Sequence, residues 1–124
     1  MKYIITEDQY AFLKYGEKPR LDYMEQFQLE IQEIIDNNFD FLLEENNSND
    51  YYNKILDLIV DDDIRLGIGN RGYDIKIWAV VDYNENKKYF INSRIIEYKI
   101  REFIREKYGF KTSVKIKLTL PPSD

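Results

Sequence analysis

The sequence of 124 residues contains neither cysteine nor histidine. Their absence excludes disulfides, thiolate zinc sites, cysteine nucleophiles and serine–histidine catalytic pairs. General acid–base chemistry near neutral pH would have to use carboxylate, lysine or tyrosine side chains with shifted pKa values. The sequence therefore favours a protein without a cofactor and lowers the expectation that it is an enzyme.

Long apolar runs are also missing. No stretch approaches the roughly 20 apolar residues that a membrane span needs, and the first residues lack the charged-then-apolar pattern of a signal segment. The chain is nevertheless 44% hydrophobic and 15% aromatic, enough to bury a core within one domain of this length. We expect a soluble, intracellular single domain over residues 1–124 with no membrane partner.

Helical patterns dominate the first half of the chain. A capping-box pattern at Thr6 and Gln9 predicts a short helix to Tyr15, and Pro19 suits the first turn of a longer one. The polar segment 44–50 predicts a break, followed by a third helix over about 50–60. The long helix carries an apolar stripe at three- and four-residue steps: Met24, Phe27, Ile31, Ile34 and Ile35.

The second half changes period. Apolar residues alternate from Tyr73 to Val81, which predicts a strand, and residues 83–91 read as a turn and the returning strand of a hairpin. A helix over 93–108 and an alternating strand over 112–120 follow. The predicted fold is α+β: N-terminal helices packed on a small, mostly antiparallel sheet with a β-hairpin, a C-terminal helix and a final strand. Residues 1–63 are mainly helical in this prediction, and 64–124 are β-β-α-β.

Glycines at 67, 69 and 72 have the G-x-G-x-x-G spacing of phosphate-binding loops. Such a loop needs a helix directly after the glycines, because the helix N-terminus receives the pyrophosphate. A strand pattern follows here instead. The same objection applies to the I-G-x-x-G-x-x-I loop of KH domains, which joins two helices. We interpret the glycines as a tight connection between Leu66 and Tyr73.

A metal-dependent nuclease is one alternative. The predicted order from residue 50 resembles the αβββαβ core of restriction-endonuclease-like proteins, and Asp74-Ile75-Lys76 matches their (D/E)-x-K signature. The resemblance implies that Asp63 and Asp74 hold Mg²⁺ and that Lys76 orients the attacking water. Asp74 falls on the second predicted strand, whereas the family more typically uses the third.

This signature is short. From the composition, about two matches are expected by chance, and the sequence has three, the others being Glu85-x-Lys87 and Glu97-x-Lys99. The acidic run 61–63 does not continue as a calcium loop, which would need Asp or Asn where Arg65 stands and Gly where Leu66 stands. The sequence thus predicts no metal site outside the nuclease alternative.

Charge is divided unevenly along the chain. Residues 1–63 contain 16 acids and 5 bases, a net charge of −11, and residues 64–124 contain 7 acids and 13 bases, a net charge of +6. An acidic half that faces the basic half of a neighbouring copy would favour self-association or docking into an assembly. The overall charge of −5 opposes nucleic-acid binding at long range.

The helix predicted over 93–108 concentrates the positive charge on one side. At 100° per residue, a stripe forms opposite the apolar face, and it consists of Arg94, Tyr98, Arg101 and Arg105. The stripe is an ordinary solvated face, a protein-contact surface rich in Arg and Tyr, or, together with Lys111, Lys115 and Lys117, a contact for nucleic-acid phosphates. Glu97 and Arg101 can also pair at four-residue spacing.

The opening residues MKYIITEDQ resemble the start of small uncharacterised proteins encoded by large tailed bacteriophages. This resemblance implies a phage origin and a location in the host cytoplasm or in the virion. Together with the missing catalytic side chains and the charge division, it favours a non-enzymatic interaction or assembly protein. The expected partner is another protein or a second copy, and nucleic acid is a less favoured alternative.

Overall fold

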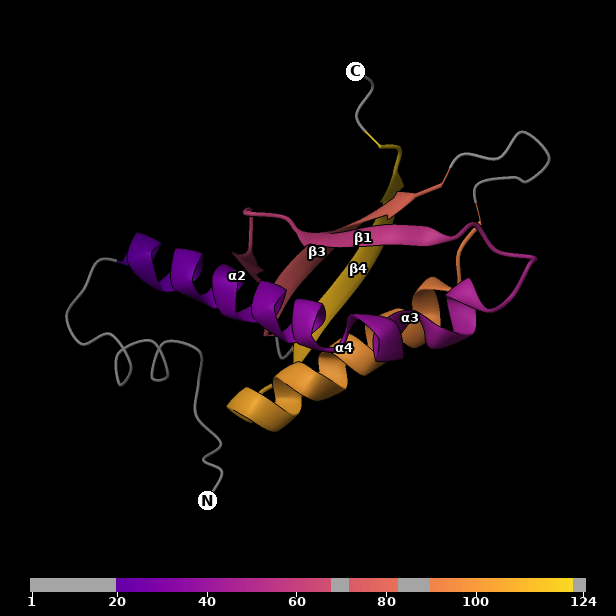
Figure 1. Ribbon diagram of the computed structural model, residues 1–124. Helices are drawn as coiled ribbons and strands as arrows, with labels where there is room; N and C mark the ends of the chain where they lie inside the picture. The colour runs from indigo at the N-terminus through magenta and orange to yellow at the C-terminus, as the bar shows by residue number, and fades with distance from the viewer. Residues whose placement is uncertain (1–19, 68–71, 83–89, 122–124) are drawn as a thin grey trace.

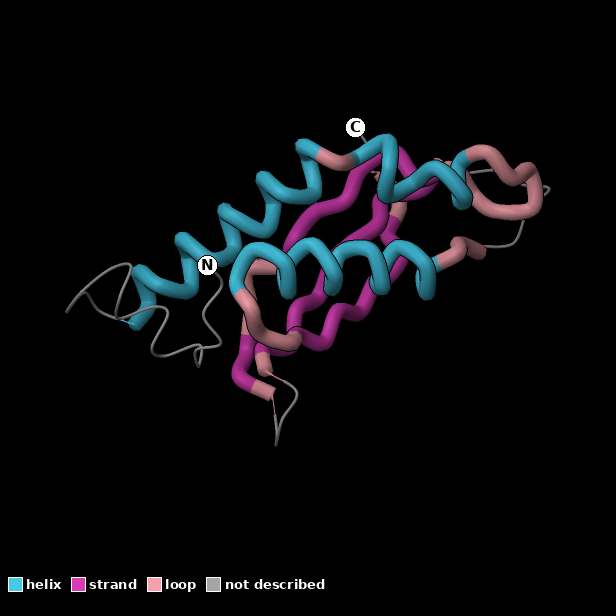
Figure 2. Tube along the Cα trace, turned by 90° about the horizontal axis from the view of Figure 1, so that it is seen from below, coloured by secondary structure: helices cyan, strands magenta, loops and turns pink. Residues whose placement is uncertain are grey.

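The structure is a computed structural model that describes residues 20–67, 72–82 and 90–121. The described elements are α2 (Arg20–Asn37), α3 (Phe39–Asn47), β1 (Ile55–Val60), β2 (Arg65–Leu66), β3 (Tyr73–Val81), α4 (Ser93–Tyr108) and β4 (Thr112–Thr119) (Figure 1). Seen from below, all three helices lie in front of the strands (Figure 2). The described helices therefore cover one face of the sheet. The helix predicted over 6–15 lies outside the described residues.

β3 is the central strand of the sheet. β1 and β2 pair antiparallel with one edge of β3, as two parts of one interrupted strand, and β4 pairs in parallel with the other edge. α4 connects β3 to β4, since a parallel pair needs a long crossover connection. The predicted α+β fold with a C-terminal helix and a final strand is confirmed, and two of the three strand pairings are antiparallel.

The core lies between the helices and the covered face of the sheet. Every second residue of β3, from Tyr73 to Val81, is buried on this face, and the alternation predicted for β4 is found as well. The apolar stripe of α2 is confirmed, with Phe27, Ile31 and Ile35 buried. α4 closes the core with Ile96, Ile100 and Ile104, which are fully buried. Burying these side chains is the main favourable term in folding.

The glycine segment connects two paired strands. The N–H of Gly67 donates to the C=O of Gly72 across the start of the hairpin, and Gly72 has a φ of 71°, a conformation that glycine adopts at little cost. β3 begins directly afterwards. Leu66 pairs with Tyr73, so the two ends of the predicted connection lie together. Residues 68–71 between them lie outside the described part of the chain.

The helix predicted over 50–60 is wrong, because Ile55–Val60 forms strand β1. A segment this short fits a helical and an extended pattern equally well by periodicity, and pairing with β3 decides between them. The hairpin consequently forms between β3 and the strands before it. The predicted returning strand is not found at Phe90 and Ile91, which lie outside any strand, and the rest of that segment, 83–89, is not among the described residues.

The predicted polar break at 44–50 is partly helical, since α3 extends to Asn47. Two asparagines here are buried. Asn46, within this segment, is 0% exposed, and Asn53, shortly after it, is 1% exposed. Asn46 Nδ2 donates to the C=O of Asn53 at 2.9 Å, and its Oδ1 accepts the N–H of Asn92 at 2.8 Å. Asn53 Oδ1 accepts the N–H of Phe90 at 2.6 Å. These amides join α3, the segment before β1 and the entry to α4.

Side chains cover the outer edges of the sheet. The outward N–H of Val60 donates to Gln32 Oε1, while Gln32 Nε2 donates to the C=O of Leu58. Gln28 and Asn47 make similar contacts to Val60 and Ile55. On the other edge, Glu97 accepts the N–H of Ile116. Unpaired edges invite association with another chain, so these contacts oppose strand-to-strand assembly.

Replacement of Gln32 by leucine tests this edge. We expect Gln32→Leu to lower the free energy of unfolding by about 1–2 kcal/mol, because it removes the partners of the Leu58 carbonyl and the Val60 amide. Self-association at high concentration should also rise, which analytical ultracentrifugation would detect. Gln26→Leu, at an exposed position of α2, is the matched control. Equal behaviour of the two variants would contradict the edge-capping role.

Candidate functional site

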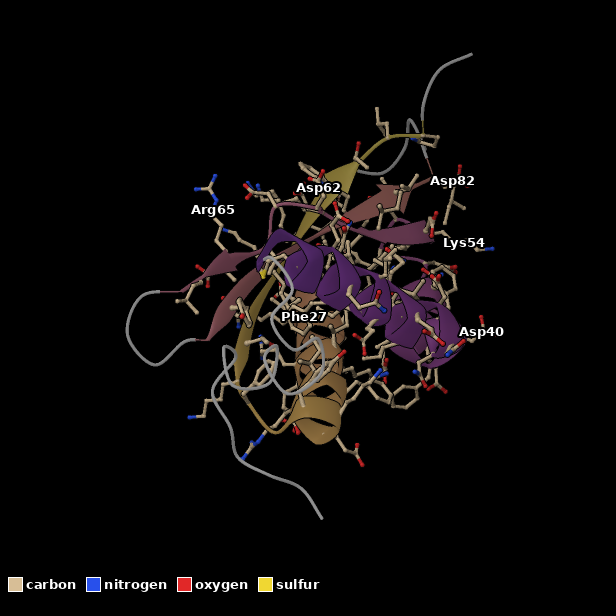
Figure 3. The ribbon with its side chains drawn as sticks, turned by 90° about the vertical axis from the view of Figure 1, so that its left-hand side faces the viewer. Phe27, Asp40, Lys54, Asp62, Arg65 and Asp82 are labelled. Carbon is tan, nitrogen blue, oxygen red and sulfur yellow. The ribbon has the colours of Figure 1, made fainter. Side chains whose placement is uncertain are left out.

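A hollow of about 410 Å³ lies on the sheet face that the described helices leave uncovered. It forms beside β3 where the neighbouring strand is interrupted between β1 and β2. In Figure 3, Phe27 points into the core, whereas Asp62 and Arg65 project away from the helices. The residues that line the hollow come from this interruption and from β2, β3 and β4: Asp63, Arg65, Asp74, Ile75, Lys76, Ser113 and Lys115.

Asp74 and Lys76 reach the hollow from β3. Both lie on the uncovered face because the intervening Ile75 is buried in the core. The Oδ1 atom of Asp74 is buried and has no hydrogen-bond partner among the residues that the structure describes. A buried oxygen without a partner is costly. This carboxylate is therefore suited to a cation or a hydrogen-bond donor that enters the hollow.

Asp63 lines the same hollow but is already paired. Both of its carboxylate oxygens accept from Arg65 Nε at 3.1 Å, and the Arg65 Nη2 to Asp63 Oδ2 distance is 2.9 Å. The side chains of Arg65 and Asp63 are 77% and 54% exposed. Such a surface pair contributes little to stability, so a ligand that competes for either partner can separate it at low cost.

Asp61 was not among the predicted site residues. Its N–H donates to the C=O of Lys76, opposite which it lies, and its Oδ2 accepts Trp78 Nε1–H at 2.8 Å. The hydrogen bond from Trp78, followed by that from the Asp63 amide, lowers the pKa of Asp61 below its ordinary value. Asp61 is thus held ionised and fixes the Trp78 ring on the uncovered face. The pairing of β1 with β3 could have indicated this contact, but the segment of β1 reads as helix.

Ser113 and Lys115 also line the hollow, although the sequence did not place them with Asp63, Asp74 and Lys76. The parallel register sets Ser113 beside Asp74 and Lys115 beside Lys76. The alternation of β4 already indicated that Ser113 and Lys115 share one face, but not that this face joins the Asp74 side of β3. That follows only from the strand register.

The stripe on α4 faces outward as predicted. Arg94, Arg105 and Tyr98 are exposed, and Arg101 is half-buried. Among the described residues, the three arginines form no ion pair. Glu97 does not pair with Arg101 as expected, because its carboxylate accepts the Ile116 amide instead. The orientation of the stripe is confirmed, and its role as a contact surface stays a prediction.

Other charges of α4 are neutralised within the chain. Lys99 Nζ lies 2.6 Å from Glu45 Oε2 on α3, and Lys107 Nζ lies 3.5 Å from Glu30 Oε1 on α2. The same Lys99 contact lowers the pKa of Glu45. The division of charge between the two halves of the sequence is thus partly satisfied by contacts inside one molecule, which weakens the argument that it serves self-association.

The arginine stripe of α4 and the lysines of β4 lie on two separate surfaces. Lys115 and Lys117 are exposed on the uncovered face of the sheet. The arginines of α4 lie on the far side of the helical layer, since the isoleucine side of α4 packs on the sheet. The stripe and the β4 lysines therefore lie on different surfaces, and joint nucleic-acid binding by the stripe, Lys111, Lys115 and Lys117 stays a prediction.

Comparisons with known proteins found no matching family model and no curated protein or solved structure with significant similarity. Among the described elements, no helix combines the length and apolar character that crossing a membrane requires. Within the same residues, no three acidic side chains come together as a metal-binding group. A cation at the hollow would therefore have at most two carboxylates, Asp74 and Asp63, as side-chain ligands from the residues that line it.

Proposed function

We propose that this protein is a divalent-cation-dependent nuclease whose active site is the hollow beside β3. The observation that carries the proposal is the convergence of Asp63, Asp74 and Lys76 around one hollow, with the Oδ1 atom of Asp74 buried and lacking a partner in the described structure. These three residues come from two segments joined by the β2–β3 hairpin.

The donor set suits Mg²⁺ chemistry. Mg²⁺ keeps several waters and is commonly bound by one or two carboxylates together with substrate phosphates, so Asp74 and Asp63 suffice on the protein side. When bound, such an ion polarises the phosphodiester and activates a water. Lys76 would orient that water, and Lys115 and Arg65 would hold phosphate oxygens through charge-assisted hydrogen bonds.

The element order also supports the proposal. The order predicted from residue 50 is wrong, since Ile55–Val60 is a strand rather than the first helix. The αβββαβ order of the restriction-endonuclease-like core is met from α3 onward, through β1, β2, β3, α4 and β4, when the two parts of the interrupted strand are counted separately. Asp74 lies on β3, the third strand in chain order, where that resemblance expects the (D/E)-x-K residues. The chain differs in that β1 and β2 pair with the same edge of β3.

Cleavage assays test the proposal. Incubated with single-stranded and duplex DNA and RNA, the protein should cleave in Mg²⁺ or Mn²⁺ and not in EDTA. We expect Asp74→Asn to reduce the rate at least about a hundredfold, with an unchanged or higher urea midpoint because a half-buried charge is removed. Asp57→Asn, which alters an exposed carboxylate of β1 outside the hollow, should stay active. Absence of cleavage by the wild type, or full activity of Asp74→Asn, would refute the assignment.

The interaction role remains a second proposal for a different surface. It is favoured by one observation: Tyr98 is 56% exposed between arginines that form no ion pair with any described residue. Arg and Tyr are enriched among residues that dominate protein interfaces. A phage origin, a virion or host-cytoplasm location and a partner protein or second copy belong to this proposal.

A further inference from the structure

One row of side chains leads away from the hollow along the uncovered face. Lys76 lies beside Lys115 in the parallel register, and Trp78 lies beside Lys117 on the next rung. We call these four residues the lysine–tryptophan strip. Lys76 and Lys115 also line the hollow, so the strip begins at the proposed active site.

The strip combines two kinds of contact. Lys115 and Lys117 form no ion pair with a described residue, and they are exposed at a spacing of about 6.6 Å along β4. Lys76 lies opposite Asp61 and attracts its carboxylate. Trp78 is half-buried and is held in place by Asp61, with Lys76 Nζ 5.8 Å from the centroid of its ring. Lysines bind phosphates, and a fixed aromatic ring stacks on a base.

The strip is narrow. On the β1 side it is bordered by carboxylates on the same face, since Asp57 lies opposite Val80 and Asp61 lies opposite Lys76. These charges repel a second phosphate backbone. A base within a duplex is also stacked and paired, and so is not free to lie on Trp78.

We propose that the lysine–tryptophan strip binds one single strand of nucleic acid and leads it into the hollow. This inference rests on the proposed nuclease function and adds to it the substrate class. Phosphates contact Lys76, Lys115 and Lys117, and one base stacks on Trp78.

Trp78 is the sole tryptophan of the chain, so its fluorescence reports binding directly. In EDTA, which removes divalent cations, an oligothymidylate of about 12 nucleotides should quench the emission in a saturable manner. Three phosphate contacts predict that the logarithm of the binding constant falls with the logarithm of salt concentration with a slope of about −2. A duplex of the same length should bind at least about tenfold more weakly.

Substitutions locate the contact. Lys117→Ala should reduce the salt slope by about 0.7, whereas Arg105→Ala, an exposed cation on α4, should leave it unchanged. With a dye-labelled oligonucleotide followed by anisotropy, Trp78→Ala should weaken binding at least about tenfold, and Trp78→Phe should retain most of the affinity because stacking is preserved.

Each outcome separates this inference from the nuclease proposal. No quenching at low salt, tighter binding of the duplex, or loss of binding through Arg105→Ala but not Lys117→Ala would overturn the strip. Binding by the strip without cleavage in Mn²⁺ would refute the nuclease while leaving the strip in place. Cation-dependent cleavage at an unchanged rate in both Lys117→Ala and Trp78→Ala would support the nuclease and refute the strip. Asp74→Asn should still bind the strand.

Discussion

Replacement of Asn46 by alanine should lower the free energy of unfolding by about 2–6 kcal/mol. The side chain is 0% exposed, donates to the Asn53 carbonyl at 2.9 Å and accepts the Asn92 amide at 2.8 Å. Alanine leaves both main-chain groups buried without these partners, and each such loss costs about 1–3 kcal/mol. Urea denaturation followed by circular dichroism would measure the change.

Two further variants show whether the hydrogen bonds are responsible. Asn37→Ala removes an exposed asparagine at the end of α2 and should change stability by no more than about 0.5 kcal/mol. Asn46→Asp keeps an acceptor for the Asn92 amide but loses the donor to Asn53, so it should also be strongly destabilising. A loss below about 1 kcal/mol for Asn46→Ala would mean that water replaces the hydrogen bonds of Asn46. The contact between α3, the segment before β1 and the entry to α4 would then be open to solvent.

Ile100→Ala should cost about 3–4 kcal/mol. Ile100 is fully buried on the side of α4 that packs on the sheet, and truncation of a buried isoleucine removes transfer free energy and leaves a cavity. Glu102→Ala, at an exposed position of the same helix, should be nearly neutral, since alanine is a good helix former. Thermal and urea unfolding of both variants would show the contrast.

Ile100→Val gives a graded check, with an expected cost of about 1 kcal/mol. If Glu102→Ala were as harmful as Ile100→Ala, α4 would have to pack on another side, and the arginine stripe would not face outward. The result therefore bears on the interaction proposal as well as on the core.

The hollow and the lysine–tryptophan strip depend on the same feature of the fold. The described helices cover one face of the sheet only (Figure 2). The other face carries the acidic and basic residues that line the hollow. A surface that only bound phosphate would gain nothing from the Asp74 carboxylate, whereas cation-dependent cleavage needs both signs of charge. This mixture is the reason to favour a nuclease at this face over a purely cationic binding surface.

The sequence by itself determined several parts of this protein. The missing cysteine and histidine limit its chemistry, the stripes of α2 and α4 show which sides are buried, and alternation identifies β3 and β4. The stripes and the alternation depend on residues close together in one helix or one strand, so local periodicity is enough to find them.

Only the tertiary structure decided the rest. Residues 55–60 become a strand because β3 is available to pair with them, and the interruption after β1 brings Asp63 to Asp74 and Lys76. The same pairing sets Asp61 against Trp78, while the layers separate the α4 arginines from the β4 lysines. These contacts join residues far apart in the chain, and their register is set by the burial of one whole face, which no short window of sequence contains.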